Sequence, residues 1–257
     1  MEQILKIATE MSGQSQDWLW AALLVFLRLG AAMSVMPAFG EAVVPQRVRL
    51  LLALGFSAVV LPVSLTPGLP APGILAAGSE VVVGLMLGIG LRLFVLALQT
   101  AAVMVANALS LAQLFGGTGP EPQPAIGNLL TMSALALAVA MGLHVKIASL
   151  FILSYQVLPA GFPLSQSDLT RWGLAQISST FALSFELAAP FVLASVVYNL
   201  ALGIINRAMP MLMVTMVGAP LLTGGGLVLM ALVFPLVLSV WLGAFDTFLA
   251  KPFQAPP

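Results

Sequence analysis

The sequence predicts an all-α polytopic membrane protein, and its composition carries the prediction. Hydrophobic residues make up 60% of the 257 residues, and charged residues make up only 7%. Soluble domains carry roughly 25% charged residues, so this chain has too few charges to cover a water-facing surface. Four uncharged runs reach or exceed the ~20 residues with which a helix crosses a bilayer. These runs cover residues 50–79, 93–120, 187–206 and 208–245.

Helices are expected rather than strands. Backbone polar groups cannot remain unpaired in lipid, so only helices and closed barrels span it. The strand-like alternation of polar and apolar residues that marks a membrane barrel is missing. Six long, bent helices in antiparallel hairpins are therefore predicted, after an N-terminal segment at residues 1–17 that lacks the marks of a signal peptide. They cover about residues 18–36, 46–63, 74–114, 126–158, 168–207 and 210–250.

Turn-forming residues and length define these elements. Pro37, Gly40 and Pro45 end the first helix, and the stretch TPGLPAPG closes the second. The third helix would contain ~40 residues and measure ~60 Å, which is too long for one straight crossing. The third, fifth and sixth helices must therefore tilt, bend or stand partly outside a bilayer core of ~30 Å.

The turn between the fifth and sixth helices interrupts an apolar run with polar residues. Asn199, Gly203 and Asn206 share one helix face, and small residues and amides on such a face favour contact with another membrane helix. Pro210 suits the first turn of a new helix. Arg207 would therefore lie at the tip of a hairpin. In the alternative interpretation, Asn206 and Arg207 only solvate a loop.

Isolated charges within the predicted helices are the next candidates. Glu80 and Arg92 lie in the third helix, Arg28 in the first and Glu186 in the fifth. Glu80 and Arg92 are ~120° apart around their helix, so they cannot pair within it. Charges inside a membrane are costly and usually functional. We expect pairing with a partner chain or a watery vestibule, and the alternative is that these charges lie near the membrane interface.

Two repeated spacings have both a functional and a plain interpretation. Gly84 and Gly88 form a small-x3-small contact face, which is common in membrane helices. Met209, Met213 and Met216 form a stripe at helical spacing, and their pliable thioethers would seal around passing chains. Simple helix packing is the alternative for the methionines.

The segment LFGGTGPEPQPAIG, residues 114–127, joins two apolar helices with four glycines and three prolines. These residues disfavour a helix or a paired strand. Such a segment is tolerated beside lipid only at a membrane surface or where it lines a cavity. An ordinary exposed turn and an obstruction in a channel both remain open on this ground alone.

No chemistry of an enzyme is visible in the sequence. It lacks a Ser/His/Asp set, a P-loop and a dinucleotide fingerprint. His144 is the only histidine and cysteine is absent, so neither a metal site nor thiol chemistry is expected, and no cofactor is predicted. The formal net charge of zero gives no reason to expect nucleic acid as a partner.

The stretch NLALGIINRAMPMLMVTMVGAPL, residues 199–221, is one of four separated motifs that carry a resemblance. It is similar to the C-terminal signature of the FliR/SctT family, the export-gate proteins of flagellar and type III secretion systems. The other three motifs follow family patterns in the same order, at residues 27–62, 79–101 and 142–161. Two departures are visible. LFGGTGPEPQP stands where the family often carries Asp-Pro, and GLH replaces Asn-Gly-His.

The resemblance implies one subunit of a hetero-oligomeric helical export gate in the bacterial inner membrane, within the flagellar basal body. Residues 18–165 would form a FliP-like part and residues 166–257 a FliQ-like hairpin. FliP-like and FliQ-like subunits would be direct partners, together with FlhB-like and FlhA-like export components. The flagellar system is favoured over the injectisome by overall similarity. The gate would surround a channel for unfolded protein substrates without being an enzyme.

The resemblance also implies roles for particular residues. The loop at about residues 114–127 would be a plug across the closed pore, with Leu111, Leu114, Phe115, Gly116, Gly117, Gly119 and Pro120. The residues expected as subunit contacts are Glu80, Gly84, Gly88, Arg92, Asn199, Gly203, Asn206 and Arg207, and of these Glu80 and Arg92 match family positions. Met209, Met213 and Met216 would add a pore seal, although the family places its methionine constriction mainly in the FliP-like subunit.

Two rival functions remain at the level of sequence. A secondary transporter would also be polytopic and glycine-rich, with broken helices at the membrane midplane. It usually has paired halves, and no convincing internal repeat is present. The second rival is a structural membrane scaffold that never lines a pore. Cross-linking of a stalled substrate separates the scaffold from a gate subunit.

Overall fold

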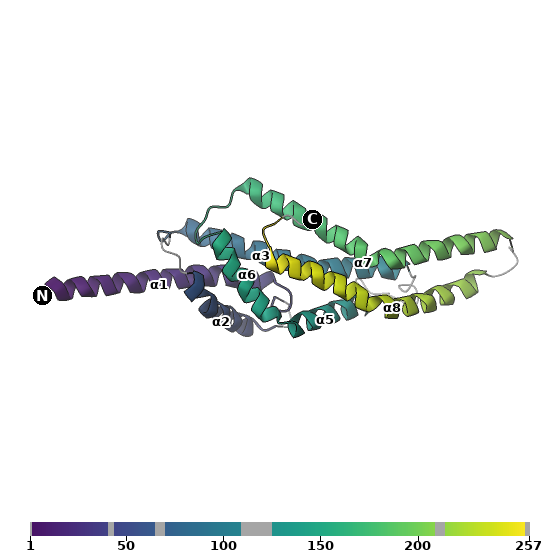
Figure 1. Ribbon diagram of the computed structural model, residues 1–257, viewed down its shortest axis with the longest axis horizontal. Helices are drawn as coiled ribbons and strands as arrows, with labels where there is room; N and C mark the ends of the chain where they lie inside the picture. Colours follow the sequence, from purple (N-terminus) through teal and green to yellow (C-terminus); the bar gives the residue numbers. More distant parts are fainter. Residues whose placement is uncertain (1, 41–43, 65–69, 109–124, 209–213, 255–257) are drawn as a thin grey trace. The chain divides into compact units, whose positions relative to one another are not determined.

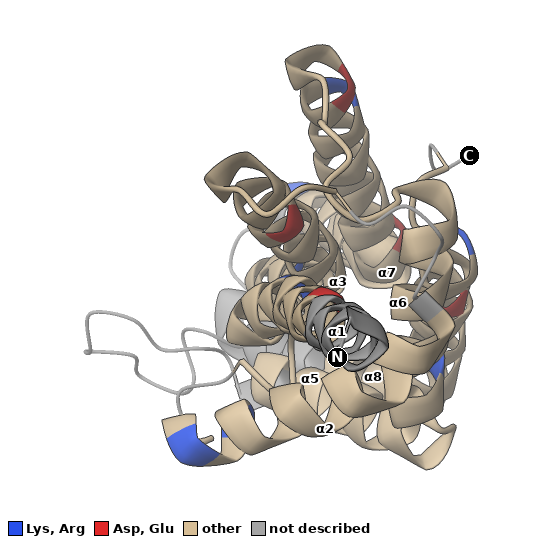
Figure 2. Ribbon diagram, turned by 90° about the vertical axis from the view of Figure 1, so that its left-hand side faces the viewer, with Lys and Arg blue, Asp and Glu red and all other residues tan. Residues whose placement is uncertain are grey.

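The fold is helical throughout the part of the chain that the structure describes. A computed structural model describes residues 2–40, 44–64, 70–108, 125–208 and 214–254, and these contain helices and connecting turns but no strand. The ribbon is almost free of charged residues (Figure 2), as the composition requires. The predicted fold class, an all-α membrane protein, is therefore confirmed.

The helices keep most of the predicted limits (Figure 1). The first begins at Glu2, so helical structure continues through the N-terminal segment that the sequence sets apart. The helices are α1 (Glu2–Val35), α2 (Gln46–Ser64), α3 (Ile74–Ala108), α5 (Ala125–Ala140), α6 (Leu143–Val157), α7 (Gln166–Ala208) and α8 (Val214–Ala250). The end predicted for the third helix and the start predicted for the sixth, at Pro210, lie outside the described residues.

The fourth predicted helix is wrong in one respect, because the structure divides it into α5 and α6. Helix α5 ends at Ala140 and α6 begins at Leu143. Gly142 lies between them with φ 81 and ψ 37, a left-handed conformation that glycine adopts without steric cost. The amides of Val145 and Lys146 then hydrogen-bond to the Gly142 carbonyl at 3.0 and 3.2 Å. This glycine therefore ends one helix and starts the next.

Five described helical segments are long and apolar enough to cross a membrane, or six if the bent pair of α5 and α6 forms one span. The predicted excess length is confirmed for α3, α7 and α8, which contain 35, 43 and 37 residues. At 1.5 Å per residue, α7 measures ~65 Å, about twice the hydrocarbon core of a bilayer.

The chain divides into two compact units. The first contains residues 1–92, 142–176 and 247–257, and the second contains residues 93–141 and 177–246. Helices α3, α7 and α8 contribute residues to both units. Each unit mixes residues from both sides of Gln166, so the division into FliP-like and FliQ-like parts stays a prediction.

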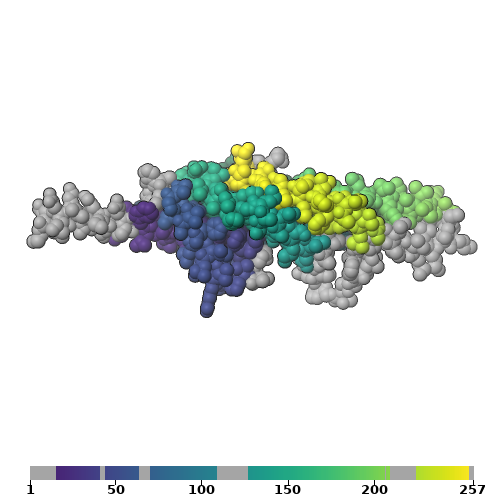
Figure 3. Space-filling model, turned by 60° about the horizontal axis from the view of Figure 1, so that its bottom comes forward, coloured from purple at the N-terminus to yellow at the C-terminus, as the bar shows by residue number. Residues whose placement is uncertain are grey.

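In the first unit, α1 packs on α3 and α2 packs on α1 and α6. The dark blue side chains of α2 form part of the outer surface beside the teal side chains of α6 (Figure 3). The indole of Trp20 on α1 donates a hydrogen bond to the Pro70 carbonyl at 3.0 Å, which ties α1 to the segment that precedes α3. Leu24, Leu29, Met33 and Leu87 are fully buried here.

In the second unit, aromatic residues join α8 to α3. The buried Trp241 stacks on Phe245 with ring centroids 4.9 Å apart. Its indole nitrogen donates to the Phe94 carbonyl at 2.8 Å, and Phe94 meets Phe245 edge to face at 5.4 Å. Offset and edge-to-face pairs of this kind add to the stability that the buried area provides.

Candidate functional site

A buried ion pair joins α1 to α3 and forms the centre of the most polar site in the described interior. Arg28 Nε donates to Glu80 Oε2 at 2.7 Å and Arg28 Nη2 donates to Glu80 Oε1 at 3.0 Å. Both residues have 0% relative exposure. The contact is therefore bidentate, the geometry in which a guanidinium and a carboxylate interact most strongly.

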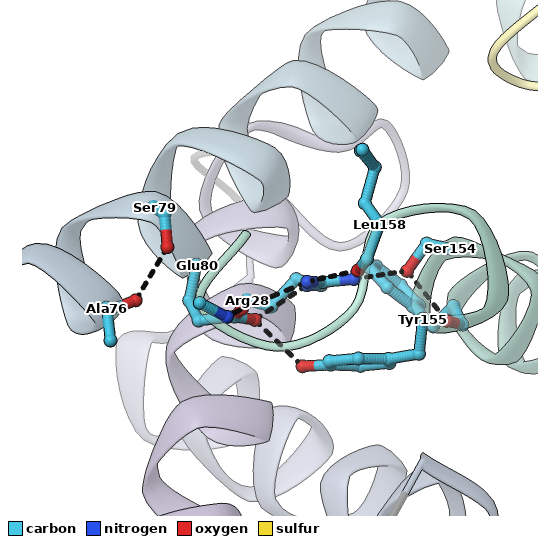
Figure 4. Close-up of polar contacts among 9 residues, drawn as sticks. Arg28, Ala76, Ser79, Glu80, Ser154, Tyr155 and Leu158 are labelled. Carbon is cyan, nitrogen blue, oxygen red and sulfur yellow. Dashed lines mark hydrogen bonds and ion pairs between the residues drawn. The ribbon is translucent and has the colours of Figure 1, made fainter. Parts of the chain in front are cut away.

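Helix α6 completes the surroundings of this pair (Figure 4). Arg28 Nη1 donates to Ser154 Oγ and Nη2 donates to the Leu158 carbonyl, both at 3.0 Å. The guanidinium carbon lies 3.6 Å from the centroid of the Tyr155 ring, close enough for a cation–π interaction. The phenol of Tyr155 donates to Glu80 Oε2 at 3.0 Å. We call Arg28, Glu80, Ser154, Tyr155 and the turn at residues 158–161 the Arg28 clasp.

The turn after α6 closes the clasp through Gly161. Its amide donates to Glu80 Oε1 at 2.9 Å. Its φ of 72 lies in the left-handed region, and a Cβ added there would lie 2.6 Å from Pro70 Cγ. Only glycine combines this backbone conformation with so close an approach. The turn that leads into α7 is thereby fixed to α3.

The hydrogen bonds of the clasp show what it does chemically. The Glu80 carboxylate accepts from Arg28 Nε, Arg28 Nη2, the Tyr155 hydroxyl and the Gly161 amide. These four donors use the roughly four acceptor positions of an ionised carboxylate. A buried charge is tolerated only with such full compensation. The clasp therefore fixes three helices and a turn, and the carboxylate has no position left for a substrate.

Glu80, which was expected to be a subunit contact, finds its ion-pair partner within the chain, and its contact with another subunit stays a prediction. Pairing with a partner chain was expected because Arg92, the other charge on α3, cannot reach it. The structure supplies Arg28 of the same chain instead. Arg92 Nη1 donates to the Val35 carbonyl at the end of α1 at 3.3 Å, where a cation is favourable. Arg92 is half-buried, and its role as a subunit contact stays a prediction.

Gly84 and Gly88 lie at a helix contact, as their spacing predicts, but the contact is with α1 of the same chain. A Cβ on Gly88 would lie 2.6 Å from the Ala32 carbonyl oxygen, and one on Gly84 would collide with the Arg28 carbonyl. Both glycines therefore serve a contact within the chain, and a contact with another subunit stays a prediction. A small-x3-small pattern shows that a helix backbone approaches, but it does not identify the helix.

The C-terminal end of α7 has a different character, because it is exposed almost all round. Asn199, Gly203 and Arg207 are exposed, and nothing lies within 4 Å of a Cβ added to Gly203. Leu200 and Ile204 on the same stretch are 65% and 63% exposed. An apolar helix end of this kind needs lipid or another protein to cover it.

Nearer the middle of α7, Glu186 and its neighbour Phe185 are both exposed. Glu186 has no ion-pair partner within the residues that the structure describes. A carboxylate in the middle of an apolar helix is costly in lipid. This position therefore requires a cation or water from outside the described chain.

The structure does not test most of the remaining predicted site residues. The plug residues Leu111, Leu114, Phe115, Gly116, Gly117, Gly119 and Pro120, the methionines Met209 and Met213, and the side chains of Asn206 and Met216 lie outside the described residues. His144 is exposed, and the described part of the chain holds no group of three side chains that could bind a metal.

Sequence reasoning missed Ser154, Tyr155 and Gly161. The stretch LSYQVLPAG holds a Ser-Tyr pair one helical turn before a proline and a glycine. Two hydroxyls together at the end of an apolar helix are a signal for a buried polar partner, because an unpaired buried hydroxyl is costly.

Comparison with known proteins finds one matching family and several relatives that cover most of the chain. The family described as "Bacterial export proteins, family 1" matches residues 19–248. The chain is 33% identical over 229 residues to the flagellar biosynthetic protein FliR of Caulobacter vibrioides, a match that covers 86% of this chain and 91% of that protein. It is 30% identical over 235 residues to the FliR protein of Escherichia coli, covering 87% and 88%. The FliR protein of Aquifex aeolicus is 27% identical over 244 residues, covering 91% and 93%. The chain therefore belongs to the FliR/SctT family of bacterial export proteins.

Proposed function

We propose that this chain lines and closes a channel through which the flagellar export apparatus passes unfolded proteins across the inner membrane. Membership of the family supports the coarser statement that the chain is an inner-membrane component of the flagellar export apparatus. The finer proposal gives it a place in the basal body, with FliP-like and FliQ-like subunits as neighbours and FlhB-like and FlhA-like components nearby.

The observation that carries the proposal is the amount of apolar helix that the chain leaves uncovered. Only 17% of the most apolar window in the α7 span and 22% of that in the α8 span are buried by the chain itself. The α7 span, Gln166–Ile205, has 40 residues, or ~60 Å, whereas lipid covers ~30 Å. The length of α7 that lipid cannot cover supports the proposal that other protein subunits cover it.

The exposed end of α7 is the part that we assign to subunit contact. Asn199 and Gly203 lie one turn apart, so a helix from a FliQ-like subunit could approach the glycine and bond to the amide. Glu186 is the natural position for a basic side chain of a neighbouring subunit. Arg207 would lie near the tip of this contact.

A glycine substitution tests this assignment with a control on the same helix. Gly203→Leu adds a large side chain where this chain leaves open space, so the full chain should stay stable while its co-purification with FliP-like and FliQ-like subunits falls severalfold. Gly173→Leu also enters open space on α7 and should leave co-purification unchanged. Equal recovery of partners with both variants would contradict the assignment.

The channel itself is tested by cross-linking. The chain contains no cysteine, so Phe115→Cys or Met213→Cys provides a unique attachment point in the assembled complex. A stalled export substrate should cross-link to either variant and not to Leu51→Cys, which lies on the exposed face of α2. Cross-linking to none of the three would favour a scaffold that never lines the pore, and cross-linking only to the α2 control would refute the assignment of Phe115 and Met213 to the channel.

The plug function has its own test. Deleting residues 116–122 should raise the leakage of small solutes through the resting complex, because the loop that obstructs the channel would be shortened. A complex that assembles normally and has unchanged permeability would refute plugging while leaving the subunit role intact.

A further inference from the structure

The two halves of helix α7 differ in composition, and Glu186 stands where the change occurs. Half of the twenty residues at 166–185 are polar or charged, whereas residues 187–206 include only one serine, two asparagines and one tyrosine as polar residues. This second stretch contains no charge, and Arg207 follows it directly. Helix α7 therefore contains an apolar run with one charged residue at each end.

The length of this run matches the apolar thickness of a membrane. The 21 positions from Glu186 to Arg207 correspond to ~31 Å at 1.5 Å per position. The hydrocarbon core of a bilayer is ~30 Å thick. The run is therefore long enough to cross a bilayer once without any contribution from residues 166–185.

The surface of α7 changes at the same point. Within the run, Leu193, Val197 and Ile204 share one helix face and are 66%, 68% and 63% exposed. In the first half of the helix, Asp168 and Arg171 form an ion pair whose side chains are 78% and 68% exposed. Exposed apolar side chains require lipid or protein as a cover, whereas an exposed ion pair is suited to water.

Glu186 itself has two groups that need hydrogen-bond donors. Its side chain is exposed and has no ion-pair partner within the residues that the structure describes. Pro190 lies inside the helix four positions later, and proline has no N–H to donate to the Glu186 carbonyl. The hydrocarbon core has no water to satisfy such groups, but the membrane surface provides it for both.

We propose that α7 crosses the bilayer once, through residues 187–206, with Glu186 at one membrane surface and Arg207 at the other. Residues 166–185 then stand outside the lipid. A partner protein alone would not limit the charge-free run to one bilayer thickness. Contact of Gly203 with another subunit would take place inside the bilayer, where small residues allow helices to approach. This placement of α7 does not depend on the channel function.

Single cysteine variants of the full chain test this placement, because the chain contains no cysteine of its own. Ser178 and Ala194 lie eight positions on either side of Glu186, and both are exposed. The variants are Ser178→Cys, Ala194→Cys and Arg207→Cys, labelled with a membrane-impermeant maleimide. A strain without the other subunits of the export apparatus is used, so that protection from the reagent comes from lipid and not from a neighbouring protein.

After cell lysis, Ser178→Cys and Arg207→Cys should react about tenfold faster than Ala194→Cys, because apolar surroundings disfavour the reactive thiolate. In intact spheroplasts, only one of the first two should react, since they lie on opposite sides of the membrane. All three variants should react equally in denaturing detergent, which is the matched control for intrinsic reactivity.

Spin labels at positions 178 and 194 of the purified chain in liposomes give a second measurement. A water-soluble nickel chelate should relax the label at 178 more strongly, and oxygen, which concentrates in hydrocarbon, the label at 194. The placement would be overturned by rapid maleimide labelling of Ala194→Cys or by protection of Ser178→Cys. Labelling of Ser178→Cys and Arg207→Cys from the same side, or the reverse order of relaxation, would overturn it as well.

Discussion

Replacing Arg28 with methionine should destabilise the chain severely, because methionine fills a similar volume but removes every donor of the guanidinium. Glu80 would keep only the Tyr155 hydroxyl and the Gly161 amide of its four donors. The carboxylate would remain at 0% exposure, without a counter-ion. Removing one partner of a buried ion pair costs about 3–5 kcal/mol. For a chain of this length, that corresponds to a fall of roughly 10 °C in the unfolding midpoint.

The measurement is thermal unfolding of the full chain in detergent, followed by the fluorescence of its four tryptophans. Arg171→Met is the matched control, since it removes the same side chain from a pair with Asp168 at 3.2 Å whose side chains are 78% and 68% exposed. An exposed pair contributes roughly 0–1 kcal/mol, so this variant should unfold near the unaltered midpoint.

A double variant separates the stranded charge from lost packing. Arg28→Met with Glu80→Gln removes the buried charge and keeps an amide oxygen that can accept from Tyr155 or Gly161. It should recover part of the stability lost in Arg28→Met alone, because a neutral group is far less costly to bury. The reasoning is refuted if Arg28→Met unfolds no earlier than Arg171→Met, or if the double variant is no more stable than the single one.

Three further substitutions test other contacts in the same assay. Gly88→Leu should push α1 away from α3 and lower the free energy of unfolding by at least about 1–3 kcal/mol, the usual range for overpacking. Gly55→Leu enters open space and should leave the unfolding midpoint almost unchanged. Similar midpoints for the two variants would contradict the contact between α1 and α3. Gly161→Ala combines a positive φ with a Cβ 2.6 Å from Pro70, whereas Gly142→Ala has the positive φ with nothing within 4 Å. The first should therefore lower the midpoint more, and the reverse order would show that the Pro70 contact is relaxed in solution. Trp241→Phe should lose ~1 kcal/mol with the hydrogen bond to the Phe94 carbonyl, and an unchanged midpoint would make that bond negligible.

Much of the fold was predictable because it depends on local properties of the chain. Runs without charge located the membrane-length helices, and prolines and glycines located their ends. The break between α5 and α6 was missed because a single glycine such as Gly142 is tolerated inside a helix and does not by itself mark an end. Hydrophobicity alone does not distinguish one long helix from two that meet at a left-handed glycine.

The site was harder to predict because its contacts join residues far apart in the sequence. The sequence singled out Glu80 and Arg28 as isolated charges but gave no way to bring them together, since they are 52 positions apart. Gly84 and Gly88 predicted a close approach, yet the identity of the facing helix depends on topology. The exposed end of α7 was easier to predict, because its apolar composition alone indicates that lipid or another protein must cover it.

The residues of the Arg28 clasp are synthesised at different times, and this order has a consequence for insertion of the chain into the membrane. Arg28 is synthesised 52 residues ahead of Glu80 and 126 residues ahead of Ser154. At ~5–20 residues per second, the guanidinium waits roughly 3–10 s for its carboxylate. During that interval the first helix carries a lone cation that discourages its release into lipid. Insertion of the first and third helices as a pair, after translation has passed Glu80, resolves this conflict.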